Sequence, residues 1–107
     1  MATKFEFLKM LAPFKDNQVV ICMDSSGSWD NIIEVVKDGG QIAIRFGSSS
    51  RRFSKLDLIK SLEPFHEDSC VICKRENDGW DNVEELGEID GMTVIHFGGG
   101  SPFSSER

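Results

Sequence analysis

The feature that most constrains this chain is an internal repeat. An offset of 51 residues aligns residues 3–52 with residues 54–103 without a gap, and 17 of the 50 aligned pairs are identical. A unit of about fifty residues buries little apolar surface by itself, so we expect the two units to complete one compact domain. The repeat therefore predicts two copies of one small motif that share a hydrophobic core.

Each unit begins with the sequence pattern of a helix. A threonine or serine is followed three positions later by an acidic residue, at 3–6 and at 54–57, which is the spacing of a capping box. Apolar residues then recur at helical spacing, namely Phe5, Leu8, Leu11, Leu56, Ile59 and Leu62. Pro13 and Pro64 are expected to end the two helices, because proline lacks the amide hydrogen that a continuing helix needs.

Three strands are expected after each helix. The apolar runs at residues 19–23 and 70–73 are typical of strands covered on both faces. Alternating segments then flank turns at residues 38–40 and 90–91, where an Asp-Gly pair indicates a hairpin. Each unit is thus helix–strand–strand–strand. Two units predict an α+β domain with pseudo-twofold symmetry, in which the helices cover an antiparallel sheet.

Net charge divides the two units. The whole chain carries −6, which disfavours direct nucleic-acid binding because that needs clustered cations. Residues 3–52 have seven Lys/Arg against six Asp/Glu, a net charge of +1, whereas residues 54–103 have four against eleven, a net charge of −7. The second unit alone is therefore strongly acidic.

The two equivalent loops that contain tryptophan are the first candidate site. Both tryptophans, Trp29 and Trp80, occupy equivalent positions. Each is followed by an aspartate and an asparagine, namely Asp30, Asn31, Asp81 and Asn82. Tryptophan can anchor a partner or stack on a ring, and the polar neighbours supply donors and acceptors. A structural interpretation stays open, in which tryptophan caps the core and Asp or Asn holds the loop.

An acidic stretch at residues 76–90 is the second candidate. Its carboxylates are Glu76, Asp78, Asp81, Glu84, Glu85, Glu88 and Asp90. The spacing does not match the calcium ligands of an EF-hand. A solvated face explains most such runs, but the first unit lacks this one, which favours a surface that meets a basic partner.

The third candidate is the Gly/Ser segment at residues 47–52, which leads into the second helix. Small residues before a helix can bind an anion through free amide groups, and Arg45, Arg51 and Arg52 could supply positive charge. The segment lacks the Gly-Lys-Ser/Thr sequence of a phosphate-binding P-loop. A plain connector between the units is the alternative.

Cysteine and histidine give little support for a metal site or for catalysis. Cys70 and Cys73 have redox-pair spacing, and His66 and His96 could add ligands, but strand residues three apart point to opposite faces. We therefore expect buried thiols, no metal, no cofactor and no catalytic set. Three cysteines and the absence of a signal sequence or an apolar span favour a cytoplasmic protein with no membrane contact.

Each unit resembles short uncharacterised proteins of phages and bacteria with a helix, a proline, an apolar strand, a tryptophan loop and a hairpin. The matching residues are 8–13, 19–21 and 29–32, and then 58–64, 71–72 and 78–83. The resemblance implies a small accessory protein of viral or mobile-element type that blocks a host defence.

Two functions follow as hypotheses. The first is a non-enzymatic inhibitor or accessory protein whose acidic face occupies a basic protein partner, with Trp80 as the anchor. Its carboxylates are Asp78, Asp81, Glu84, Glu85 and Glu88. The second is a binder of a small, nucleotide-like anion. Its candidate residues are Trp29, Asp30, Asn31, Trp80, Asn82, Arg45, Arg51 and Arg52. Either one is compatible with a homo-oligomer.

Overall fold

A computed structural model describes residues 2–24, 26–48, 50–75 and 79–97. Within these ranges, two helices and eight strands follow one another in the order that the repeat predicts, with one short strand added before each helix. The first repeat contains β1 (Ala2–Thr3), α1 (Lys4–Leu11), β2 (Val19–Met23), β3 (Trp29–Asp38) and β4 (Gln41–Gly47). The second contains β5 (Phe53–Ser54), α2 (Lys55–Leu62), β6 (Cys70–Arg75), β7 (Trp80–Ile89) and β8 (Met92–Phe97).

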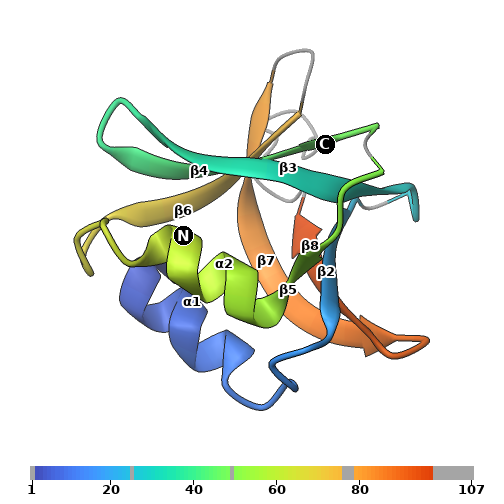
Figure 1. The fold of residues 1–107 in the computed structure, drawn as a ribbon. Coiled ribbons are helices and arrows are strands. Elements are labelled where there is room, and N and C mark those ends of the chain that lie inside the picture. The colour runs from blue at the N-terminus through green and yellow to red at the C-terminus, as the bar shows by residue number, and fades with distance from the viewer. Residues whose placement is uncertain (1, 25, 49, 76–78, 98–107) are drawn as a thin grey trace.

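The strands form one mixed sheet that closes on itself (Figure 1). The order β6-β4-β3-β2-β8-β7 becomes a six-stranded barrel because β7 also pairs with β6, while β1 and β5 attach to β6 and β2. The α+β class is confirmed, but the prediction of an antiparallel sheet is wrong. Strand β2 pairs in parallel with β8, and β4 pairs in parallel with β6. Both parallel pairs join one repeat to the other, a relation that local sequence patterns do not contain.

Pairings between the repeats recur at the offset of the sequence repeat. Val20 lies opposite Thr93 in the β2–β8 pair, and Ile42 lies opposite Val71 in the β4–β6 pair. Adding 51 to Ile42 and subtracting 51 from Val71 gives the first pair again. The same operation converts the β1–β6 register into the β5–β2 register. Each repeat therefore supplies strands that complete the other repeat's part of the barrel.

The helices lie side by side, below β4 and β6 in the view of Figure 1, and cover one end of the barrel. Both begin at complete capping boxes, Thr3 with Glu6 and Ser54 with Asp57, and both end just before the prolines, as predicted. The predicted apolar face is partly wrong, because Phe5 and Leu56 are about half exposed. The predicted residues Leu11 and Leu62 are buried, and Leu8 and Ile59 pack against the core. The other buried helix residues are Lys4, Phe7, Lys55 and Leu58.

One buried lysine on each helix forms hydrogen bonds to the other repeat. The Lys4 Nζ atom donates to the backbone oxygen of Phe65 at 2.8 Å, just beyond the end of α2. The Lys55 Nζ atom donates to the backbone oxygen of Phe14 at 2.6 Å, just beyond the end of α1. Each ammonium thus binds carbonyl groups that follow the opposite helix, where a positive charge is favoured. The sequence alone gave no sign of this exchange.

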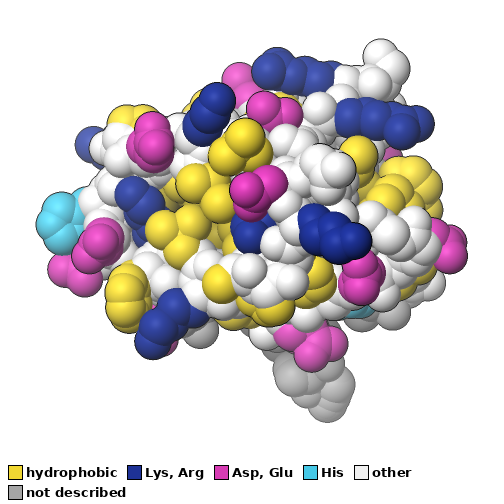
Figure 2. Space-filling view, turned by 60° about the horizontal axis from the view of Figure 1, so that its bottom comes forward, with side chains coloured by type: hydrophobic (Ala, Val, Ile, Leu, Met, Phe, Trp, Pro, Cys, Tyr) yellow, Lys and Arg dark blue, Asp and Glu magenta, His cyan; other side chains and the backbone are white. Residues whose placement is uncertain are grey.

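The core fills the barrel between the helices and the far strand ends. Its fully buried side chains come from equivalent positions of both repeats, such as Val20 with Val71 and Phe46 with Phe97. Ile21 and Ile72 on the other faces of β2 and β6 are also buried, which confirms that these apolar strands are covered on both faces. Figure 2 shows the end covered by the helices, where apolar side chains gather among charged ones.

Both predicted hairpin turns are present. Gly39 and Gly40 connect β3 to β4 with φ values of 59° and 95°, and Asp90 and Gly91 connect β7 to β8 with φ values of 51° and 79°. Two successive residues with positive φ are what a type I′ turn requires, which explains the glycines at these positions.

Candidate functional site: the tryptophan segments and the acidic strand

The prediction that the tryptophans lie in loops is wrong, because they occupy the first positions of strands β3 and β7. Trp29 lies opposite Met23 of β2, and Trp80 lies opposite Lys74 of β6. Their exposed fractions are 49% and 51%, so neither indole is enclosed by the core. Each presents a large apolar surface to solvent beside polar neighbours, an arrangement typical of side chains that anchor a partner.

The aspartates that follow the tryptophans lie opposite two buried cysteines of the neighbouring strands. Asp30 is opposite Cys22, and Asp81 is opposite Cys73. Burial raises the pKa of the Asp81 carboxyl, and the charges of Glu84 and Asp24 raise it further, while Arg75 opposes them. Ionisation of Asp81 therefore lowers the stability of the folded state, and carboxyl groups with such shifted pKa values are common at binding sites.

Replacing Asp81 with asparagine tests whether the ionised carboxylate destabilises the folded state. A carboxyl whose pKa is raised by folding destabilises the native state as pH rises through the unfolded and then the folded pKa. We expect Asp81→Asn to increase the free energy of unfolding slightly at pH 7, by less than about 1 kcal/mol because the group is partly solvated. The gain should disappear at pH 3, where both proteins are neutral at this position. Equal gains at both pH values in chemical denaturation would contradict the cause.

Asn82 is a further polar group at the start of β7. Its side-chain oxygen is buried and has no hydrogen-bond partner among the described residues. Its equivalent, Asn31, does take part in an interaction. An unpartnered buried acceptor costs free energy, so this oxygen lowers the stability of the folded state.

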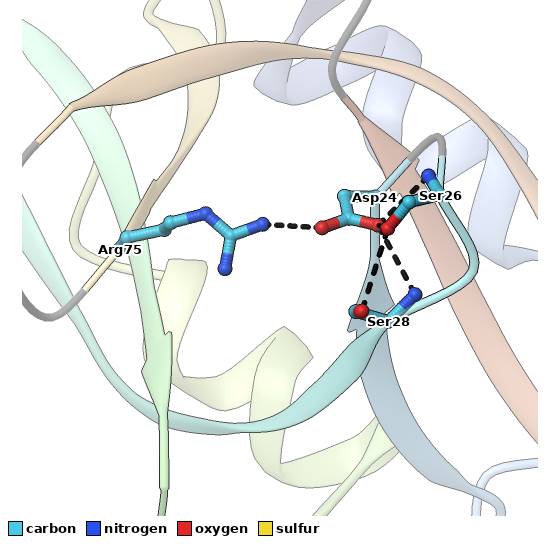
Figure 3. Close-up of polar contacts among 4 residues, drawn as sticks. All are labelled: Asp24, Ser26, Ser28 and Arg75. Atoms are coloured by element: carbon cyan, nitrogen blue, oxygen red, sulfur yellow. Dashed lines mark hydrogen bonds and ion pairs between the residues drawn. The ribbon is translucent and has the colours of Figure 1, made fainter.

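An ion pair joins the ends of β2 and β6 near the tryptophan segments (Figure 3). Asp24 Oδ2 accepts a hydrogen bond from Arg75 at 2.6 Å. The other oxygen accepts from the Ser26 hydroxyl at 2.6 Å and from the amides of Ser26 and Ser28 at 2.9 and 3.1 Å. The Ser26 hydroxyl and these other donors lower the pKa of Asp24. This carboxylate therefore shapes the loop that precedes Trp29.

Sequence reasoning missed the ion pair, although the repeat contains its signal. Asp24 and Arg75 occupy equivalent positions, so opposite charges meet where identical residues would repel each other. The Arg75 guanidinium also lies over the rings of Phe46 and Phe97, at 5.3 and 5.5 Å from their centroids. These cation–π contacts place the arginine over the aromatic pair of the core.

Cys22 and Cys73 are buried free thiols, whereas Cys70 is partly exposed. Burial raises the pKa of the Cys22 thiol well above its usual value, and the neighbouring Cys73 thiol contributes to the shift. Cys73 and Cys70 thus differ in exposure, as strand geometry predicts for residues three apart. No group of three or more metal-ligating side chains occurs among the residues that the structure describes.

The acidic stretch lies mostly on β7. Glu84, Glu85 and Glu88 are exposed there, Asp81 is half-buried, and Asp78 lies outside the described residues. In the equivalent strand β3, Glu34 pairs with Arg45 at 2.5 Å and Asp38 pairs with Lys74 at 2.9 Å. Glu85 instead lies opposite His96, and none of the ion pairs in the described part of the chain involves a β7 carboxylate. The negative charge of β7 is therefore not neutralised within the described structure.

The arginines proposed for a small anionic ligand are differently placed. Arg45 is held by Glu34, and the Arg51 guanidinium lies 4.8 Å from the ring centroid of Phe53. Arg52 is exposed and makes no hydrogen bond, ion pair or ring contact among the described residues. Two of the three cations already have intramolecular partners, which weakens the hypothesis of an anion site built from them.

Comparison with protein families, curated proteins and solved structures finds no match to this chain. Neither helix in the described ranges is long and apolar enough to span a membrane.

Proposed function

We propose that this chain is a non-enzymatic binding protein that occupies a basic protein partner through the acidic face of β7. The observation that carries the proposal is the contrast between equivalent strands. The carboxylate of Glu34 is neutralised by Arg45, whereas Glu85 and its neighbour Glu84 have no cationic partner among the described residues. A partner that presents lysine or arginine would supply the missing charges.

Trp80 supplies the apolar anchor beside these charges. It begins the strand that carries Glu84 and Glu85, and half of its side chain is exposed. Interfaces commonly combine a central aromatic anchor with a charged rim that steers association. The pairing of residues across the repeats supports a pseudo-twofold arrangement inherited from a homodimer of the single unit.

Reversing two charges on β7 tests the proposal. In the Glu84→Lys/Glu85→Lys variant, we expect capture of the partner to fall by at least about a hundredfold, because attraction becomes repulsion. Glu88 is left unchanged, since its carboxylate accepts a hydrogen bond from Gln18 at 2.5 Å. The measurement is retention of host proteins by the immobilised chain at about 0.15 M salt, where screening beyond roughly 8 Å removes nonspecific attraction.

A matched control is available on the helix side. Glu63→Lys/Glu67→Lys changes the net charge equally, both residues are exposed, and their structural hydrogen bonds use backbone atoms. The control should retain what the original chain retains. Circular dichroism should show both variants folded. If the β7 variant retains the same proteins, or the original chain retains none, the proposal is wrong.

A further inference from the structure

Two equivalent grooves lie between a hairpin turn and the loop after a helix, and they differ in chemistry. The first, here the closed groove, runs between the β7–β8 turn and the loop after α1. The second, here the open groove, runs between the β3–β4 turn and the loop after α2. The open groove is lined by Lys37, Gly40, Gln41, Pro64, Phe65, His66 and Ser69.

In the closed groove, the chain's own Gln18 bridges the two sides. Its Nε2 atom donates to the Glu88 carboxylate at 2.5 Å and to the Gly91 carbonyl at 2.9 Å. Its Oε1 atom accepts from the Lys15 amide at 3.0 Å, and the residue is only 9% exposed. A neutral amide donor and a carboxylate acceptor thus join the turn to the loop.

In the open groove, both members of this bridge are replaced. Ser69 occupies the position equivalent to Gln18, and Lys37 occupies the position equivalent to Glu88. Serine is too short to repeat the bridge, and a cation stands where the closed groove has an anion. The result is a pocket of about 320 Å³. That volume lies within the range of about 300–1,000 Å³ typical of small-molecule sites.

The groups around this pocket are mainly hydrogen-bond donors. Among the described residues, no hydrogen bond or ion pair engages the Lys37 ammonium. The His66 Nδ1 atom accepts from the Asp68 amide at 3.1 Å, so the neutral ring carries its proton on Nε2. The Asp68 carboxylate lies 3.8 Å from the same Nδ1 atom and leaves Nε2 free of it. Ser69 and Gln41 add a hydroxyl and an amide.

We propose that the open groove binds a small organic phosphate ester. A phosphate group offers three acceptor oxygens and negative charge to Lys37, His66 and Ser69. The organic group would lie against Pro64 and Phe65, which form the apolar side of the pocket. The site uses none of the β7 residues assigned to the protein partner, so it stands or falls independently of the proposed function.

Phenyl phosphate is the probe for a test by amide NMR shifts of the full chain. We expect saturable shifts confined to residues 37–41 and 65–69, with residues 14–18 and 88–92 unmoved. Benzyl alcohol, which lacks the anion, should leave the spectrum unchanged. Inorganic phosphate that binds as tightly as phenyl phosphate would indicate free phosphate as the ligand, whereas weaker binding would indicate an ester.

The Lys37→Glu/Ser69→Gln variant installs the closed-groove residues in the open groove. It should weaken phenyl phosphate binding by at least about tenfold, as expected when a charge-assisted hydrogen bond is lost. Lys37→Met removes the cation alone and should weaken binding similarly if the double variant fails to fold. Arg52→Glu is the control with the same change of charge as Lys37→Glu and should bind normally. Absence of localised shifts, or an affinity in both Lys37 variants that is unchanged from the original chain, would overturn the proposal.

Discussion

Replacing Phe46 with alanine should lower the free energy of unfolding by about 3–5 kcal/mol, the largest effect expected in this chain. Phe46 and Phe97 are 1% and 2% exposed, and their ring centroids are 4.7 Å apart. Removing one ring leaves a cavity in the barrel core and removes one of the two aromatic faces beneath Arg75. The measurement is urea denaturation followed by circular dichroism and tryptophan fluorescence.

Two comparisons sharpen this experiment. Phe5→Ala removes a ring that is 50% exposed, and should cost less than about 1 kcal/mol. Phe46→Leu keeps most of the volume and should fall between the two alanine variants. With domains of this size losing about 4–8 °C in Tm per kcal/mol, Phe46→Ala should also melt far below the original chain. A loss under about 1 kcal/mol would show that the ring is not enclosed as described.

The second large effect is expected at the buried lysines. Lys55→Met introduces an apolar side chain of similar length. It removes the ammonium group, which donates to the carbonyl groups of Phe14 and Ala12 at 2.6 and 3.4 Å. These carbonyls follow α1 and would lose their donor, so we expect a loss of about 2–3 kcal/mol. Lys4→Met should behave alike, because Lys4 binds the equivalent carbonyls after α2. Thermal unfolding measures both.

Lys60→Met is the control, since Lys60 lies on the same helix with an exposed side chain. It should change stability by less than about 0.5 kcal/mol. If Lys55→Met is as stable as the original, the carbonyls are satisfied by other means and the capping role is wrong.

The elements of this fold were largely predictable because their signals are local. Capping boxes at Thr3 and Ser54, prolines at 13 and 64, and the Asp-Gly turns each involve residues within a few positions of one another. The unbroken apolar runs predicted strands covered on both faces, and Ile21 and Ile72 are buried.

The errors have one common cause, which is contact between the repeats. The buried face of α1 includes Lys4, because carbonyls of the other repeat accept its ammonium. A pattern of apolar residues contains no information about such an acceptor, so it predicts Phe5 on the buried face of the helix. The parallel β2–β8 and β4–β6 pairs are equally invisible, because nothing local specifies which strand of the other copy lies alongside.

In the candidate sites, too, the sequence predicts some features, whereas others depend on contacts between distant residues. The sequence singled out Trp80 and the β7 carboxylates, and the structure places Trp80, Glu84 and Glu85 at the surface. Sequence patterns do not reveal that Arg45 forms an ion pair with Glu34 or that Arg75 forms one with Asp24. Those pairings decide which charges have intramolecular partners, and they depend on cross-strand and cross-repeat distances.

By itself, the sequence determined the duplication, the succession of elements within each repeat and the excess of negative charge in the second. These properties follow from residue identities and short-range backbone preferences. Only the tertiary structure decided that the strands close into a mixed barrel, that each helix end is capped from the other repeat, and that one of two equivalent grooves stands open. Each of these depends on groups far apart in the chain, whose meeting is set by packing rather than by spacing.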